Sequence, residues 1–131
     1  MILLLDTSTP TCRLTLIDDA NGDTRYDNEW QADRTLAKGL LGYLQEQLAL
    51  QGSRFSAITG IGVFQGPGSF TGLRIGLTVL NTIADSEQLP IVGATGNDWQ
   101  ADVCARLAAG ENDRIVLPFY GADAHITAPR K

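Results

Sequence analysis

The sequence lacks the excess of positive charge that direct nucleic-acid binding requires. Its 131 residues contain 10 Lys and Arg against 15 Asp and Glu, which gives a formal net charge of -5. Proteins that hold DNA or RNA on their own carry clustered basic side chains, because these neutralise the phosphates. Here the basic residues are scattered, and Arg130 and Lys131 form the one adjacent pair. We therefore expect any contact with tRNA or DNA to be indirect.

Histidine and cysteine are almost absent. The chain has a single histidine, His125, and two cysteines, Cys12 and Cys104, which form no Cys-x-x-Cys pattern. These residues cannot be assembled into a zinc signature, so no metal site is predicted. The simplest interpretation of both cysteines is that they are small buried apolar residues.

Long hydrophobic runs are also missing. The apolar run from Ile2 to Leu5 is far too short to cross a membrane, and it has neither the basic flank nor the cleavage site of a signal peptide. It is typical of a strand buried on both faces. A cytoplasmic protein without membrane contact is expected.

Hydrophobic periodicity predicts an α/β protein in the order β-β-β-α-β-α-β-α-β. Asp33 and either Asn97 or Asp98 are candidate helix caps, and Gly52 is a candidate helix end. A turn is expected at 18–22, and 120–131 is either a short strand near 124–127 or a tail. The strands are expected at 2–5, 12–16, 24–30, 57–64, 89–93 and 114–119, and the helices at 33–51, 71–84 and 98–109.

Three strands joined by short turns, followed by βα units, predict one domain over residues 1–131. Its mixed sheet contains an antiparallel three-strand meander and has helices on its faces. This is the layout of one half of the actin-like (ASKHA, ribonuclease H-like) fold.

The glycine-rich segment at 66–76, Gly-Pro-Gly-Ser-Phe-Thr-Gly-Leu-Arg-Ile-Gly, stands between an expected strand and an expected helix. It fits neither a P-loop nor a dinucleotide fingerprint, and its serine is not in a nucleophile elbow. Ser69 or Thr71 is a candidate helix cap.

Gly72 and Gly76 share one face of the expected helix, where a second backbone could approach closely. Both this helix and the one at 33–51 carry more apolar surface than one sheet face needs. The two helices either pack on each other as well as on the sheet, or expose an apolar patch to another protein. Spacing alone favours neither.

The segment 66–76 resembles the hallmark of the TsaB (YeaZ) family. Asp6-Thr-Ser-Thr9 after an apolar strand, and Leu89-Pro-Ile-Val-Gly93, resemble the same family. The resemblance implies an actin-like fold and a role in making the threonylcarbamoyl modification of tRNA adenosine. It implies a non-catalytic scaffold that binds and activates a TsaD-like transferase, is joined by a TsaE-like ATPase, and forms homodimers through the same surface. ATP and metal are then expected on the partner subunits.

The resemblance also implies which residues meet a partner, because the family's interface is built from its first two helices. Replacing Gly76 by Leu is accordingly expected to block pairing and leave the fold intact. The residues implied at the interface are Leu36, Leu40, Leu41, Leu44, Gly68, Ser69, Phe70, Thr71, Gly72, Arg74, Ile75, Gly76 and Val79.

Three features depart from the family pattern. The chain is short for the family, whose second half is largely missing here. Ala32-Asp33-Arg34 stands where relatives commonly have a His-Ser pair, and Gln65 stands where they often have an arginine. No histidine role is therefore carried over.

Asp6 and Ser8 are weak candidates for holding a phosphate or metal. The first phosphate loop of actin-like ATPases has the form Asp-x-Gly-Thr, and Ser8 occupies its glycine position. A structural, turn-capping Asp6 is favoured. The alternative functions are a nucleotide-binding ATPase or phosphotransferase-like domain, a peptidase, or a plain homodimerisation module.

Overall fold

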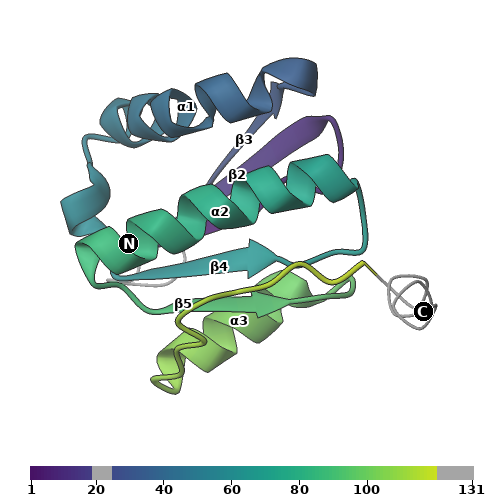
Figure 1. The fold of residues 1–131 in the computed structure, drawn as a ribbon. Helices are drawn as coiled ribbons and strands as arrows, with labels where there is room; N and C mark the ends of the chain where they lie inside the picture. The colour runs from purple at the N-terminus through teal and green to yellow at the C-terminus, as the bar shows by residue number, and fades with distance from the viewer. Residues whose placement is uncertain (19–24, 121–131) are drawn as a thin grey trace.

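A computed structural model describes residues 1–18 and 25–120 of the chain, and its centre is a five-stranded mixed sheet (Figure 1). The strand order is β3-β2-β1-β4-β5. β1 pairs antiparallel with β2 and parallel with β4, so the expected three-strand meander is confirmed. The strands are β1 Ile2–Asp6, β2 Thr11–Ile17, β3 Arg25–Gln31, β4 Gly60–Phe64 and β5 Ile91–Ala94.

Helices cover both faces of the sheet. α1 (Leu36–Leu50) and α2 (Phe70–Glu87) pack on one face, and α3 (Trp99–Ala108) packs on β4 and β5 from the other (Figure 1). Two short 3₁₀ turns, η1 (Asp33–Thr35) and η2 (Phe55–Ala57), flank α1. No helix in the described part of the chain is both long and apolar enough to cross a membrane.

β1 is buried on both faces, as its continuous apolar run predicts. Leu3 and Leu5 belong to the core beneath α1 and α2, whereas Leu4 belongs to the smaller core beneath α3. β3 is an edge strand, and its side chains alternate between exposed and half-buried. That alternation is the period-2 pattern of a strand with one covered face.

α1 buries one apolar side and a single amide. Leu40, Leu44 and Leu48 have no exposed surface. Gln47 lies within the same buried side, where its Oε1 accepts a hydrogen bond from the Tyr26 hydroxyl at 2.6 Å. This bond compensates for removing the amide from water. The Tyr43 ring stacks on Trp30, 4.9 Å between centroids, and ties α1 to β3.

Two expected helix caps differ from the structure. Asp33 lies inside η1 with φ 48°, and its Oδ1 accepts a hydrogen bond from Gln31 Nε2 at 2.9 Å. The residue that precedes α1 is Thr35, and its side chain makes no cap. Asp98 does precede α3, but it makes no capping hydrogen bond.

The strand expected at 114–119 is wrong. Residues 115–120, called the strap below, belong to no strand, and residue 115 lies in a bend. Val116 is buried, and both its backbone N–H and its C=O bond to the side-chain amide of Asn81 on α2, at 2.9 Å each. The strap is therefore fastened to α2 by a side chain and not by a neighbouring strand.

β5 cannot accept a further strand, because side chains already occupy its outer edge. The N–H of Ile91 donates to Asn112 Oδ1 at 3.0 Å, and the N–H of Gly93 donates to Asp113 Oδ2 at 3.0 Å. Arg106 Nη1 donates to the Gly93 carbonyl at 2.8 Å, and its guanidinium also bridges Asp113 and Glu111. The expected turn at 18–22 falls mainly, and the possible strand at 124–127 entirely, outside the described residues.

Neighbouring leucines on α1 test the assignment of its buried side. Leu40 is 0% exposed and Leu41 is 48% exposed. We expect Leu40→Ala to lower the free energy of unfolding by about 2–5 kcal/mol, because it opens a cavity in a packed core. Leu41→Ala is the matched control and should change it by less than about 1 kcal/mol. Urea unfolding followed by circular dichroism measures both, and equal losses would contradict the assignment.

Candidate functional site

The turn after β1 is closed by its own side chains. Asp6 Oδ1 accepts hydrogen bonds from the Ser8 backbone N–H at 2.8 Å and from the Ser8 hydroxyl at 2.6 Å. Thr7 and Ser8 are buried, with 4% and 8% of their surface exposed. The Asp6 carboxylate thus stabilises the turn, which is the structural role that the sequence favoured.

α2 rests directly on this turn through its glycine face. Thr7 Oγ1 donates a hydrogen bond to the Gly72 carbonyl at 2.8 Å. A Cβ at position 72 would overlap the Thr7 carbonyl oxygen, and one at position 76 would overlap Thr7 Oγ1. Gly68 lies equally close to Ser8. The backbone that approaches the glycine face therefore belongs to the same chain.

The expected effect of Gly76→Leu is therefore wrong. A leucine at this position would push Thr7 and the β1–β2 turn away from α2, so the substitution disturbs the fold itself.

The start of α2 presents an exposed ring. Ser69 Oγ accepts a hydrogen bond from the Gly72 N–H at 3.2 Å, so the expected cap is confirmed at Ser69. Phe70 is 54% exposed, and the Arg74 guanidinium lies over its ring, 5.2 Å from the centroid. The Tyr120 ring lies against the same phenylalanine, 4.7 Å between centroids.

A groove follows the line where α1 and α2 meet. It consists of a hollow of about 780 Å³ between Pro10, Leu36 and the start of α2, and a second of about 360 Å³ between Ala37 and the middle of α2. Thr71 and Ile75 line both hollows, so the two lie next to each other along α2. We call this feature the α1–α2 groove.

The structure separates the residues implied at the interface into surface and core. Leu40 and Leu44 lie in the core under α1, and Gly76 is buried against Thr7, so none of these three is at the surface. Leu36 is 5% exposed and lines the hollow near Pro10. Gly72, Ile75 and Val79 are half-buried. The exposed members are Leu41, Gly68, Ser69, Phe70, Thr71 and Arg74.

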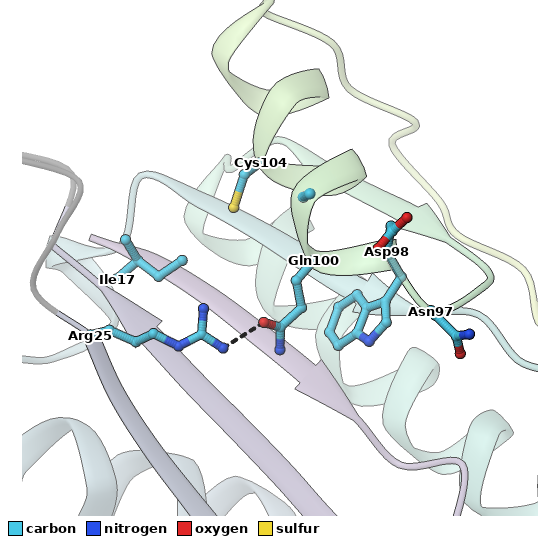
Figure 2. A pocket seen from close by; sticks show the side chains of 8 residues that line it. Ile17, Arg25, Asn97, Asp98, Gln100 and Cys104 are labelled. Carbon is cyan, nitrogen blue, oxygen red and sulfur yellow. Dashed lines mark hydrogen bonds between the residues drawn. The ribbon is translucent and has the colours of Figure 1, made fainter.

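A further hollow lies on the α3 side of the sheet, and sequence reasoning missed it. It has a volume of about 390 Å³, and its lining includes Ile17, Arg25, Gln100 and Cys104 (Figure 2). Arg25 Nη2 donates a hydrogen bond to Gln100 Oε1 at 2.6 Å, and Arg25 Nε donates to Asp27. These residues are distant in sequence and form no motif, so no pattern could have grouped them.

The described residues hold no group of three His, Cys, Asp or Glu side chains that could bind a metal. Burial raises the pKa of the Cys12 thiol to about 12, and the nearby Asp6 carboxylate adds to this shift. Burial also raises the pKa of Cys104. Thiols with raised pKa values are poor nucleophiles at neutral pH. His125 lies outside the described residues.

The chain is similar to one known protein family and to several known proteins. A family model described as TsaD, tRNA N6-adenosine threonylcarbamoyltransferase, matches residues 30–111. The tRNA threonylcarbamoyladenosine biosynthesis protein TsaB of Haemophilus influenzae is 32% identical over 111 residues, covering 85% of this chain and 46% of the relative. TsaB of Escherichia coli is 30% identical over 120 residues, covering 87% of this chain and 51% of the relative.

Solved structures of similar proteins share the fold of this chain. YeaZ from Pseudomonas aeruginosa superimposes with a TM-score of 0.67 at 30% identity, over 83% of this chain and 49% of that one. A protein described as uncharacterised, with similarity to peptidase YeaZ from Pseudomonas aeruginosa, gives a TM-score of 0.65 at 32% identity, over 72% of this chain and 42% of that one. The chain spans about half the length of the curated relatives it matches.

Two helical glycines test the contact between α2 and the β1–β2 turn. We expect Gly76→Ala to lower the free energy of unfolding by about 1–3 kcal/mol, because its Cβ overlaps Thr7 Oγ1. Gly42 on α1 has nothing within 4 Å of such a Cβ, so Gly42→Ala should raise it by up to about 1 kcal/mol through helix propensity. Thermal and urea unfolding decide the sign of each change, and a stabilising Gly76→Ala would contradict the contact.

The raised pKa of Cys12 gives a chemical and a pH test. Iodoacetamide at about pH 9 should leave Cys12 unmodified in the folded protein and modify it in urea, read by mass spectrometry of the peptides. Because the folded pKa of about 12 lies above the ordinary value of 9.0, the neutral thiol's contribution to stability is complete below pH 9 and is lost as pH rises towards 12. Rapid labelling of Cys12 without denaturant would refute its burial.

Proposed function

Because the chain belongs to the TsaB (YeaZ) family, with the actin-like fold of that family, we propose that it acts as a non-catalytic partner subunit in tRNA threonylcarbamoyladenosine biosynthesis. In this proposal it binds and activates a TsaD-like transferase in the cytoplasm. ATP and metal are held by the partner subunits, and a TsaE-like ATPase joins the complex. The chain meets tRNA only indirectly.

The α1–α2 groove is the observation that carries the proposal. It runs between two helices and has an apolar floor formed by half-buried Ile75 and Val79. Thr71 and Arg74 on its rim supply polar side chains. An apolar centre with a polar rim is the usual anatomy of a protein interface.

Exposed Leu41 extends this surface along α1. Leu41 is one helical turn beyond Ala37, which lines the groove, so both lie on the same side of α1. Leu50 lies nine residues further on, which places it about 180° around the helix. The groove side and the far side of α1 thus offer matched leucines for an experiment.

The geometry of the β1–β2 turn supports a role without chemistry of its own. Asp6 already accepts two hydrogen bonds from Ser8, and Ser8 is packed against Gly68. A phosphate needs free N–H groups in an open turn at this position.

A second copy of the chain uses the α1–α2 groove in the absence of the transferase, so the homodimer and the heterodimer exclude each other.

Size-exclusion chromatography with light scattering tests the proposal. The chain alone should form a dimer, and adding the TsaD-like protein of the same organism should convert it into a one-to-one complex. Leu41→Asp should weaken both assemblies about tenfold or more, because it places a charge on the apolar surface. Leu50→Asp is the matched control and should leave both unchanged. Failure of the wild-type chain to bind the TsaD-like protein at micromolar concentration would overturn the proposal.

A further inference from the structure

Large exposed hydrophobic side chains are confined to one layer of the described chain. Two are on α1, Leu41 and Leu50, and one, Phe70, is on α2. The other three are on the strap: Ile115, Leu117 and Phe119, which are 66%, 69% and 47% exposed. None of these three side chains lines the α1–α2 groove, so a partner confined to the groove would leave them exposed.

The strap lies along the flank of α2 that faces away from α1. Around the helix, Ile75 and Val79 point towards α1, whereas Phe70 and Asn81 point towards the strap. Tyr120 contacts Phe70 near the start of α2, and Val116 is bonded to Asn81 further along it. The chain between them runs beside β5 (Figure 1). α2 is therefore a ridge with α1 on one side and the strap on the other.

A hollow of about 770 Å³ lies between the second half of α2 and residues 112–115, where the strap begins. Its lining includes Asn81, Asp85, Asn112, Arg114 and Ile115. The ridge of α2 thus has recesses on both flanks, and Arg74 is the single basic residue along its 18 positions.

The strap is held in place before any partner binds. The Phe119 N–H donates a hydrogen bond to the Gln65 carbonyl at 2.8 Å, and Gln65 Nε2 donates one to the Leu117 carbonyl at 2.9 Å. Gly66 has no Cβ, and one at this position would overlap the Phe119 carbonyl oxygen. A surface that is already ordered loses less entropy on binding.

The area of a specific interface indicates how far a partner must extend. An 18-residue helix such as α2 is about 27 Å long. A specific interface buries about 800 Å² on each partner, and spread along the length of α2 this area corresponds to a strip about 30 Å wide. Packed helices lie about 8–10 Å apart. A strip of this width covers α1, α2 and the strap together.

We propose that the partner bound at the α1–α2 groove also crosses α2 and covers the strap. This inference rests on the proposed function. The partner places apolar side chains on both flanks of α2, against Ile75 and against Leu117, and a carboxylate at Arg74 on the ridge. Phe70, which touches both Arg74 and Tyr120, joins the two flanks into one surface.

Single charges on the strap test this inference. Leu117→Asp should weaken the complex with the TsaD-like protein about tenfold or more, measured by isothermal titration calorimetry. Leu50→Asp is the matched control, since Leu50 is 66% exposed on the far side of α1, and it should bind as the wild type does. Leu117 is exposed, so its replacement should leave the thermal unfolding midpoint within a few degrees.

Hydrogen exchange on the wild-type pair gives a second measurement that needs no variant. The amide of Leu117 should exchange more slowly in the complex than in the free chain, together with amides at the start of α2.

The possible outcomes separate this inference from the function it rests on. If Leu41→Asp weakens the complex, while Leu117→Asp does not and the strap gains no protection, the inference is overturned and the proposed function stands. If Leu117→Asp affects self-association alone, a second copy covers the strap and the inference is likewise overturned. If the wild-type chain binds no TsaD-like protein, both fail.

Discussion

The contact between Thr7 and the glycine face of α2 determines where the rest of the surface lies. Because Gly72 and Gly76 have no side chains, α2 settles directly onto the β1–β2 turn, and Thr7 fixes it there with a hydrogen bond to the Gly72 carbonyl. α1 then packs beside α2, and Asn81 anchors the strap on the other flank. A larger residue in the glycine face would move the whole layer relative to the sheet.

Most elements could be predicted because their patterns have one physical explanation. The apolar run of β1 fits a strand covered on both faces, and Ser69 before α2 fits a cap. The strap could not be distinguished from a strand, because alternating side chains describe any extended segment with one buried side. What decides between them is a partner strand, and the edge of β5 is already occupied by Asn112, Asp113 and Arg106.

The candidate site was harder to predict than the fold. A helical wheel shows that Gly72 and Gly76 share a side, but it does not say whether the approaching backbone belongs to a partner or to residues 6–9. Leu40 and Leu41 are equally apolar neighbours, and only the position of the sheet makes one core and the other surface. The Arg25–Gln100 contact joins β3 to α3 across 75 positions and leaves no local signal.

The sealed edge of β5 has a consequence for how copies of this protein can meet. With that edge occupied, β3 is the one open edge of the described sheet, and its exposed side chains include Arg25, Asp27 and Glu29. Pairing along β3 can therefore join two copies, but the joined pair presents no further open edge among the described strands, so it does not extend into a continuous intermolecular sheet.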